Sequence, residues 1–177
     1  MLRRVLIFIA VVAVMGVTAC GDDDSGGSSG GSSKEQGQDA TQTQTTPPED
    51  ALKNTGVRPV IPKPTGTPPR RLVKPDIVKG KGPAAKQGDT VVVNYVGVNF
   101  SNGEEFDSSW DSGQPFPVQI GVTQVIEGWT RGLVGIRKGG RRMLTIPPEM
   151  GYGAQGYPPD IPPNETLVFV VDAVSIK

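Results

Sequence analysis

The 177-residue chain contains no histidine and a single cysteine, and these two shortages restrict its chemistry. Without histidine there is no Ser-His-Asp or Cys-His catalytic arrangement and no histidine-based metal site. Cys20, the one cysteine, cannot form a disulfide within the chain. Basic and acidic residues number 18 each, and no basic stripe is interleaved with aromatics, so we expect no nucleic-acid partner. We expect an activity that needs no histidine base, no metal and no cofactor.

The first twenty residues have the order of a secretory signal: basic Arg3-Arg4, an apolar run from Val5 to Met15, then small residues before Cys20. The run is shorter than the roughly 20 residues that span a bilayer, which disfavours the alternative, a transmembrane anchor. Val17-Thr18-Ala19-Cys20 resembles the bacterial lipobox, whose cysteine receives two acyl chains, enough for stable anchoring. We expect residues 1–19 to be a lipoprotein signal peptide. The mature protein would then lie outside the cytoplasm, held to the cell membrane through lipidated Cys20.

A polar segment follows the cysteine. Up to about residue 46 it consists mostly of Gly, Ser, Thr, Gln and Asp, a composition that cannot bury enough apolar surface to fold. Residues 47–69 are rich in proline, which favours extended, semi-rigid conformations. Part of this stretch is a candidate edge strand, with Val57, Val60 and Ile61 as apolar contacts. We expect residues 20–58 to be a tether and residues 59–177 to be the folded domain.

From residue 71 onward the sequence is rich in predicted β-structure. The clearest predicted strands cover residues 90–98, 141–146 and 166–176. The last of these is nearly all apolar, as expected for a central strand under a helix. Residues 128–136 are the best helix candidate, because Trp129, Leu133 and Ile136 are spaced for one apolar face. Several strands with one short helix indicate an α+β domain.

Seven aromatic residues are spread over strand ends, loops and the start of the predicted helix. They are Tyr95, Phe106, Phe116, Trp129, Tyr152, Tyr157 and Phe169. One interpretation is that they fill the core, as large aromatic side chains usually do. The other is that several line one concave apolar pocket with a few polar groups, the usual form of a small-ligand site. Pattern alone leaves both interpretations open.

A series of short motifs carries a resemblance to a known family. In chain order they are Tyr95-Val96-Gly97, Glu105-Phe106-Asp107-Ser108-Ser109, Pro115-Phe116, Gln124 to Trp129, Gly132-Leu133, Tyr152-Gly153-Ala154, Ile161 to Asn164 and Thr166 to Phe169. Together they resemble the FKBP-type peptidyl-prolyl isomerase domain, without large gaps from about residue 73 to residue 176. The resemblance implies a twisted antiparallel β-sheet wrapped around one short α-helix, in a monomer. It implies a prolyl isomerase that acts on proline-containing unfolded or exported polypeptides and that a macrolide can inhibit.

The resemblance also assigns roles to residues. The implied catalytic residues are Tyr95, Phe106, Asp107, Ile126, Trp129, Tyr152 and Phe169, and the implied substrate-binding residues are Phe116, Val125, Tyr157 and Ile161. Trp129 would form the floor beneath the substrate proline, with the other apolar side chains as walls. Asp107 and the Tyr152 hydroxyl would be polar groups at the rim. The backbone N–H of Ile126 would donate a hydrogen bond to a substrate carbonyl.

This chemistry suits a chain without histidine. Rotation about an X–Pro bond breaks no covalent bond, and its barrier is amide resonance, ~18–20 kcal/mol for a peptide bond. The twisted amide is less polar than the planar one, so an apolar pocket that excludes water and fits the twisted form lowers the barrier. Two alternatives remain open: a non-catalytic module that binds proline-containing segments, and a holdase chaperone. The short loop between Tyr152 and Phe169 has no room for a chaperone insertion, which disfavours the holdase.

Asp107 has a second interpretation, as a turn carboxylate that caps the backbone amides of Ser108 and Ser109. The sequence also departs from the best-known family pattern. Ser112 replaces an arginine that can pair with Asp107 in some members, Tyr157 stands where a histidine is common, and Asp160 replaces an apolar rim residue. These departures bear on macrolide affinity and peptide preference.

One basic cluster flanks Gly139-Gly140: Arg137-Lys138 on one side and Arg141-Arg142 on the other. We interpret it as a solvated turn and strand start. The alternative is a patch that contacts anionic lipid headgroups.

Overall fold

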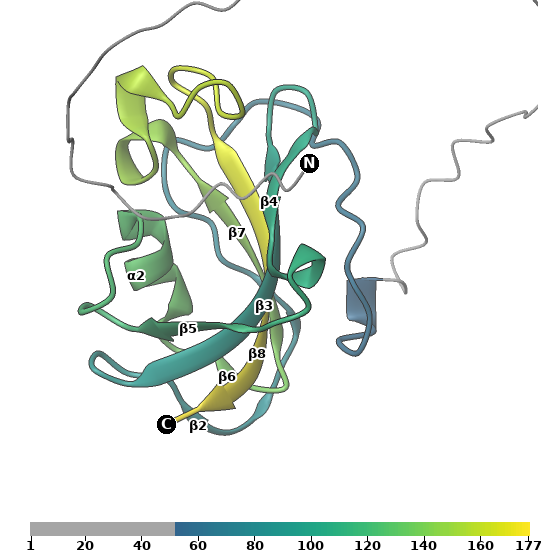
Figure 1. Ribbon diagram of the computed structural model, residues 1–177, viewed down its shortest axis with the longest axis vertical. Helices are drawn as coiled ribbons and strands as arrows, with labels where there is room; N and C mark the ends of the chain where they lie inside the picture. The colour runs from purple at the N-terminus through teal and green to yellow at the C-terminus, as the bar shows by residue number, and fades with distance from the viewer. Residues whose placement is uncertain (1–51) are drawn as a thin grey trace, which may run out of the picture. The chain divides into compact units, whose positions relative to one another are not determined.

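The computed structural model describes residues 52–177, which fold around one antiparallel sheet and one short helix (Figure 1). The signal peptide, Cys20 and most of the predicted tether lie outside the described residues. The six strands of the main sheet are β1 (Asp76–Val78), β3 (Thr90–Asn99), β4 (Glu105–Ser108), β5 (Phe116–Gln119), β7 (Arg141–Ile146) and β8 (Leu167–Ile176). Their order is β1-β7-β8-β3-β4, and β5 also pairs with β3. Within residues 52–177, no helix is long and apolar enough to cross a membrane.

Strand β8 lies at the centre of the sheet, with β7 on one side and β3 on the other. Its residues from Leu167 to Ala173 are all buried, which explains the continuous apolar sequence predicted for a central strand. Alternate residues of β3, including Val91 and Val93, point into the main core, whereas Val96 and Val98 form a second cluster with Val168. The predicted strands over residues 90–98, 141–146 and 166–176 are therefore confirmed, with end shifts of one residue.

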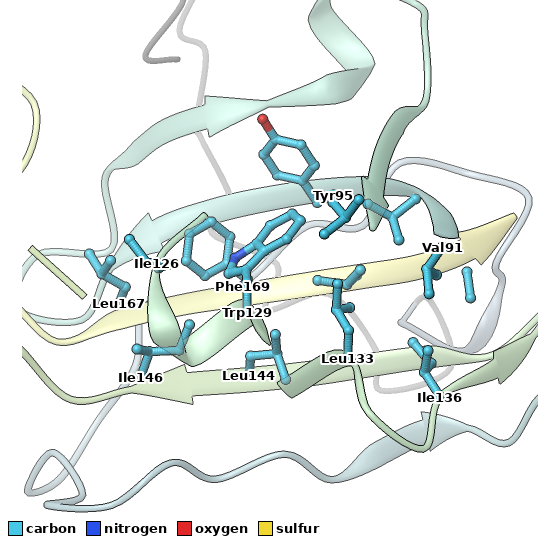
Figure 2. Packing of buried hydrophobic residues seen from close by; sticks show 14 of the residues in the cluster. Val91, Tyr95, Ile126, Trp129, Leu133, Ile136, Leu144, Ile146, Leu167 and Phe169 are labelled. Carbon is cyan, nitrogen blue, oxygen red and sulfur yellow. The ribbon is translucent and has the colours of Figure 1, made fainter. Parts of the chain in front are cut away.

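Helix α2 (Glu127–Leu133) packs on one face of this sheet (Figure 2). Its Trp129 and Leu133 side chains pack together with Leu144 and Phe169 in one buried core. A Cβ at Gly128 would lie 2.4 Å from a methyl group of Ile146, and one at Gly132 would lie 2.8 Å from Leu144. Glycine at these two positions therefore allows the helix to approach the sheet closely.

The helix ends earlier than the predicted range of 128–136. Val134 has extended backbone angles and Gly135 has a φ of 88°, a left-handed conformation that glycine adopts without strain. Ile136 lies beyond the helix but is still buried in the core. Hydrophobic spacing identified the buried residues, but it could not place the end of the helix.

The basic cluster around Gly139-Gly140 was predicted to be a solvated turn and strand start, but two of its arginines are buried. Arg141 is 0% exposed and Arg142 is 5% exposed. Arg141 binds both carboxylate oxygens of Asp172, at 2.5 and 2.6 Å. Arg142 pairs with Asp76 and donates to the carbonyl of Gly132, a free acceptor at the end of α2. The interpretation is wrong for both arginines, because Arg141 pairs with buried Asp172, and Arg142 binds Asp76 and the buried carbonyl of Gly132.

The segment before β1 adds no regular strand to the sheet over residues 52–72, so the predicted edge strand is not observed. Val57 and Val60 are 47% and 60% exposed, whereas Ile61 packs against the second cluster as expected. The carbonyls of Leu52 and Val57 accept hydrogen bonds from the Arg141 guanidinium at 2.9 and 2.8 Å. Residues on the N-terminal side of Pro59 thus contact the folded domain.

A second, two-stranded sheet lies apart from the main sheet path. It pairs β2 (Lys81–Ala84) with β6 (Arg137–Lys138) in antiparallel register. Short 3-10 helices also occur at η1 (Ser109–Asp111), η2 (Pro148–Met150) and η3 (Gly153–Gln155). Strand β2 was not predicted, because its Lys-Gly-Pro-Ala sequence has neither alternating apolar residues nor β-branched side chains.

Candidate functional site

The aromatic side chains predicted to form the site meet over helix α2. The Trp129 ring lies edge-on to Tyr95 and Phe169, with ring centroids 5.0 and 5.3 Å away, and 6.4 Å from Phe116. Phe106 of β4 lies 5.4 Å from Phe169. These edge-to-face distances are typical of favourable aromatic pairs. Figure 2 shows the rings of Trp129 and Phe169 packed together, with the Tyr95 hydroxyl directed away from them.

The structure confirms the core interpretation for most of these aromatic residues, and the pocket interpretation stays a prediction. Trp129, Tyr95, Phe106 and Phe169 are buried members of the main core, while Phe116 is only half-buried at its margin. The remaining apolar residues of the predicted site belong to the same group. Ile126 and Ile161 are buried within it, and Val125 and Tyr152 pack against it.

Trp129 carries an unusual feature for a core residue. Its indole Nε1 is buried and has no hydrogen-bond partner within residues 52–177. Unpaired buried donors are uncommon in folded proteins, and they call for a specific explanation. The indole comes from the first turn of α2 and lies in the core against which Phe116 of β5 and Tyr152 pack.

Asp107 lies beside this aromatic cluster and is held by Tyr95. The Tyr95 hydroxyl donates a hydrogen bond of 2.7 Å to the Asp107 carboxylate. Burial raises the pKa of Asp107 to about 6, and Asp111 and Glu105 add to the increase. The hydrogen bonds from Tyr95 and the Ser108 backbone act in the opposite direction and favour the carboxylate. Burial, followed by the Asp107 charge, raises the pKa of Tyr95, which stays a protonated donor.

The capping interpretation of Asp107 holds only in part. The cap of η1 is Ser108, whose hydroxyl accepts a hydrogen bond from the Trp110 backbone at 3.2 Å. Asp107 accepts from the Ser108 backbone, and its side-chain partner is the tyrosine. Ser112 donates to the Ser109 carbonyl at 2.9 Å. Tyr95 therefore orients the Asp107 carboxylate in this chain.

Two serines that sequence reasoning did not single out attach this segment to β3. The backbone N–H of Tyr95 donates to the Ser109 hydroxyl at 2.9 Å, and the Ser108 hydroxyl donates to the Tyr95 carbonyl at 3.2 Å. Both serines are buried. They hold the end of β4 against the strand that carries Tyr95. The Asp-Ser-Ser motif in the sequence pointed to these two serines, but it could not show which groups their hydroxyls bind.

The loop from Tyr152 to Ile161 forms another side of the site. The ring of Tyr157, which is 40% exposed, lies 5.7 Å from the ring of Tyr152. Burial, with the Asp107 charge second, raises the pKa of Tyr152 to about 12. Tyr157 and Ile161 exchange two backbone hydrogen bonds, which close the loop.

Asn99 anchors this loop to the sheet, a role that the sequence did not suggest. It is buried at the end of β3 and donates to the Asp160 carbonyl at 2.8 Å. The carbonyl oxygen of its side chain has no partner within residues 52–177. The loop that bears Tyr157 is thereby attached to the same strand as Tyr95.

The backbone N–H of Ile126, the predicted donor to a substrate carbonyl, makes no hydrogen bond inside the described region. Ile126 immediately precedes α2, where the first N–H groups have no partner within the helix. No cluster of three potential metal ligands of the His, Cys, Asp or Glu type occurs among residues 52–177. The site thus combines buried aromatic rings with one carboxylate and the hydroxyls of Tyr95, Tyr152 and Tyr157, and it contains no histidine that could act as a base.

Comparison with known proteins gives the same picture. The model of the family described as FKBP-type peptidyl-prolyl cis-trans isomerase matches residues 82–174. An FK506-binding protein from Streptomyces anulatus is 49% identical over 120 residues, which are 67% of this chain and 97% of that protein. A probable FK506-binding protein from Corynebacterium glutamicum is 48% identical over 118 residues, or 67% of this chain and 98% of that protein.

Solved structures agree in fold. FkpA from Escherichia coli has a TM-score of 0.54 and 49% identity, with 60% of this chain and 48% of that chain covered. AtFKBP13 has a TM-score of 0.55 and 37% identity, with 60% of this chain and 93% of that chain covered. The match to the family model includes Tyr95, Asp107, Trp129, Tyr152 and Phe169, the residues that meet at the site. From its sequence, its fold and its aromatic site, the chain belongs to the FKBP-type peptidyl-prolyl cis-trans isomerase family.

Proposed function

We propose that this isomerase accelerates X–Pro rotation in exported polypeptides, by enclosing the proline in the aromatic site and favouring the twisted amide. The observation that carries the mechanism is the edge-to-face cluster of Trp129, Tyr95 and Phe169 with Asp107 beside it. Uncatalysed X–Pro exchange takes tens to hundreds of seconds and can limit folding. An isomerase near the membrane would act on chains that emerge unfolded from export.

The proposed mechanism divides the work among four groups. Trp129 lies under the proline ring, and the surrounding aromatic side chains exclude water from the amide. Rotation removes the resonance of the amide, so the twisted state is less polar and is favoured by an apolar surrounding. The Ile126 N–H, which has no acceptor within residues 52–177, donates to a substrate carbonyl. Asp107, held by Tyr95, orients the substrate at the rim.

A protease-free assay of cis-to-trans exchange in a Leu-Pro or Phe-Pro peptide tests the proposal directly. We expect residues 52–177 to accelerate exchange, and a macrolide inhibitor to abolish the acceleration. Folded protein that binds the peptide without accelerating exchange would instead identify a non-catalytic binding module. Size-exclusion chromatography of the same sample tests the expectation that the protein is a monomer.

The location is part of the same proposal. The lipobox-like sequence before Cys20 supports acylation of this cysteine and attachment to the outer side of the cell membrane. We expect the wild-type protein in the membrane fraction and Cys20→Ser in the soluble fraction after export. Retention of Cys20→Ser in the membrane would contradict lipid anchoring.

A further inference from the structure

One end of the domain carries a concentrated positive charge. We use the name basic sheet for strands β2 and β6 together with the two lysines that flank β2. Its exposed cations are Lys79, Lys81, Lys86, Arg137 and Lys138. No acidic residue occurs from residue 77 to residue 88 or from residue 128 to residue 148. None of the five cations forms an ion pair with a residue in the described part of the chain.

The fold brings like charges together in this sheet. Lys81 lies directly opposite Lys138 in the β2–β6 register. Like charges at directly opposed positions destabilise a sheet. The backbone before β2 packs closely against β6, because a Cβ at Gly80 would lie 2.3 Å from the Arg137 carbonyl oxygen. No ion pair within the described residues offsets this repulsion, so an anionic partner would relieve it.

The basic sheet is also well placed with respect to the site. The turn after β6 is fixed to the main sheet, because the Gly139 N–H donates to the Ala173 carbonyl at 2.7 Å. Ala173 and Phe169 are four residues apart on β8, a separation of about 13 Å along the strand. The basic sheet therefore lies towards the opposite end of β8 from the aromatic site. Figure 1 shows β2 and β6 near the C-terminus, at the lower end of the domain.

The N-terminal segment joins the domain near this end. The carbonyl of Leu52 accepts a hydrogen bond from Arg141, which follows β6 after a two-glycine turn. Leu52, the first described residue, is therefore bonded to a residue three positions after the end of β6. A surface bound there would leave the aromatic site accessible.

We propose that the basic sheet is a docking surface for anionic lipid headgroups, and that it holds the domain with its aromatic site directed away from the bilayer. Clusters of four to eight basic residues at a membrane surface bind anionic lipid by charge complementarity. Residues 77–89 and 134–142 contain no aromatic side chain on which a nucleic-acid base could stack, which favours a lipid surface over single-stranded nucleic acid. Docking through this surface does not require acylation of Cys20.

The test uses residues 52–177, so that no acyl chain contributes to binding. The 120 aligned residues make up 97% of the Streptomyces anulatus protein. That protein therefore consists almost entirely of a domain of this length. Sedimentation with vesicles of phosphatidylcholine alone, and of phosphatidylcholine mixed equally with phosphatidylglycerol, measures the partition coefficient. The test variant is Lys79→Gln/Lys81→Gln/Lys138→Gln. The control, Lys63→Gln/Arg70→Gln/Arg71→Gln, removes the same charge from other exposed positions.

We expect binding to the phosphatidylglycerol vesicles only, weaker at high salt. Each removed cation should lower the partition coefficient about fivefold, so the test variant should bind about a hundredfold more weakly. The control should keep most of the binding, and both variants should keep wild-type turnover of a soluble peptide. Equal losses in test and control, equal binding to both vesicle types, or binding to RNA with none to vesicles would each overturn the proposal.

Discussion

At the scale of single residues, Asp107 differs from the other acidic side chains of the domain in its environment. It is half-buried beside aromatic rings and accepts a 2.7 Å hydrogen bond from Tyr95. Burial opposes its ionisation, while the tyrosine and the Ser108 backbone support it. The net result is a pKa of about 6.

This pKa predicts how stability depends on pH. The pKa of Asp107 is about 6 in the folded state, whereas the ordinary pKa of the group is 3.8. Between these two pH values the folded protein therefore retains the proton while the unfolded chain loses it. Asp107 therefore makes the protein less stable as pH rises from about 4 to about 6. Urea titrations should show Asp107→Asn gaining stability relative to wild type across this window and no further above it. A constant difference from pH 3 to pH 8 would contradict the raised pKa.

The proposed mechanism predicts an order of importance for activity. We expect Phe106→Ala and Trp129→Ala each to lower kcat/KM more than about tenfold, because both open the apolar enclosure. A tenfold loss corresponds to about 1.4 kcal/mol of transition-state stabilisation. Asp107→Ala should lower it less, since rotation needs no proton transfer. Peptide isomerisation assays provide the comparison, with circular dichroism to establish folding. Trp129→Phe, which keeps a ring, is the matched variant. Full activity in folded Trp129→Ala would refute the pocket mechanism.

At the scale of elements, helix α2 determines where the floor of the site lies. Seven residues are too few for a stable isolated helix, so its position depends on packing. Gly128 and Gly132 face the sheet, and Arg142 donates to the Gly132 carbonyl at 2.7 Å near the C-terminal end of the helix. A cation is favourable there because it interacts with the free carbonyls and the helix dipole.

Gly128→Ala is a test of this packing. Alanine is a better helix former than glycine by about 1 kcal/mol, which alone would stabilise the protein. The new Cβ would lie 2.4 Å from Ile146, and overpacking of this kind costs typically 1–3 kcal/mol. We expect a net destabilisation in urea unfolding. Thr130→Ala serves as the control. Gly128→Ala/Ile146→Ala should lose less stability than the sum of its single changes, and strict additivity would contradict the steric explanation.

At the scale of the whole molecule, charged side chains connect segments that are far apart in sequence. Arg141 reaches from β7 to Asp172 of β8 and to the carbonyls of Leu52 and Val57. Arg58 pairs with Glu105 and Asp111, on either side of Asp107 in the sequence. Together these contacts attach the segment before Pro59 to the sheet and to the strand of the site.

The Arg141–Asp172 pair makes a prediction for global stability. Arg141→Met leaves the Asp172 carboxylate buried without its partner, and breaking a buried pair in this way costs about 3–5 kcal/mol. Arg141→Met/Asp172→Leu removes both charges, so we expect it to recover much of that loss. Chemical denaturation measures the two free energies of unfolding. A double variant no more stable than Arg141→Met would contradict this account.

Several features of the molecule followed from the amino-acid sequence because they depend on local pattern. The apolar run Leu167 to Val171 predicted a buried central strand, and the spacing of Trp129 and Leu133 identified one face of a helix. The order of the motifs from Tyr95 to Phe169 identified the family and the residues that meet at the site. Cys20 and the surrounding signal are also local patterns, and they remain predictions.

Other features were decided only by tertiary structure. The two arginines after Gly140 look solvated in sequence, yet both are buried, because Arg141 meets Asp172 31 positions later and Arg142 meets Asp76 66 positions earlier. Asn99 anchors a loop 61 residues away, and β2 exists only through its pairing with β6. Such contacts join residues whose separation carries no periodic signal. Burial then decides which charges are paired in the core, which carboxylate has a pKa near 6, and which cations stay exposed at the surface.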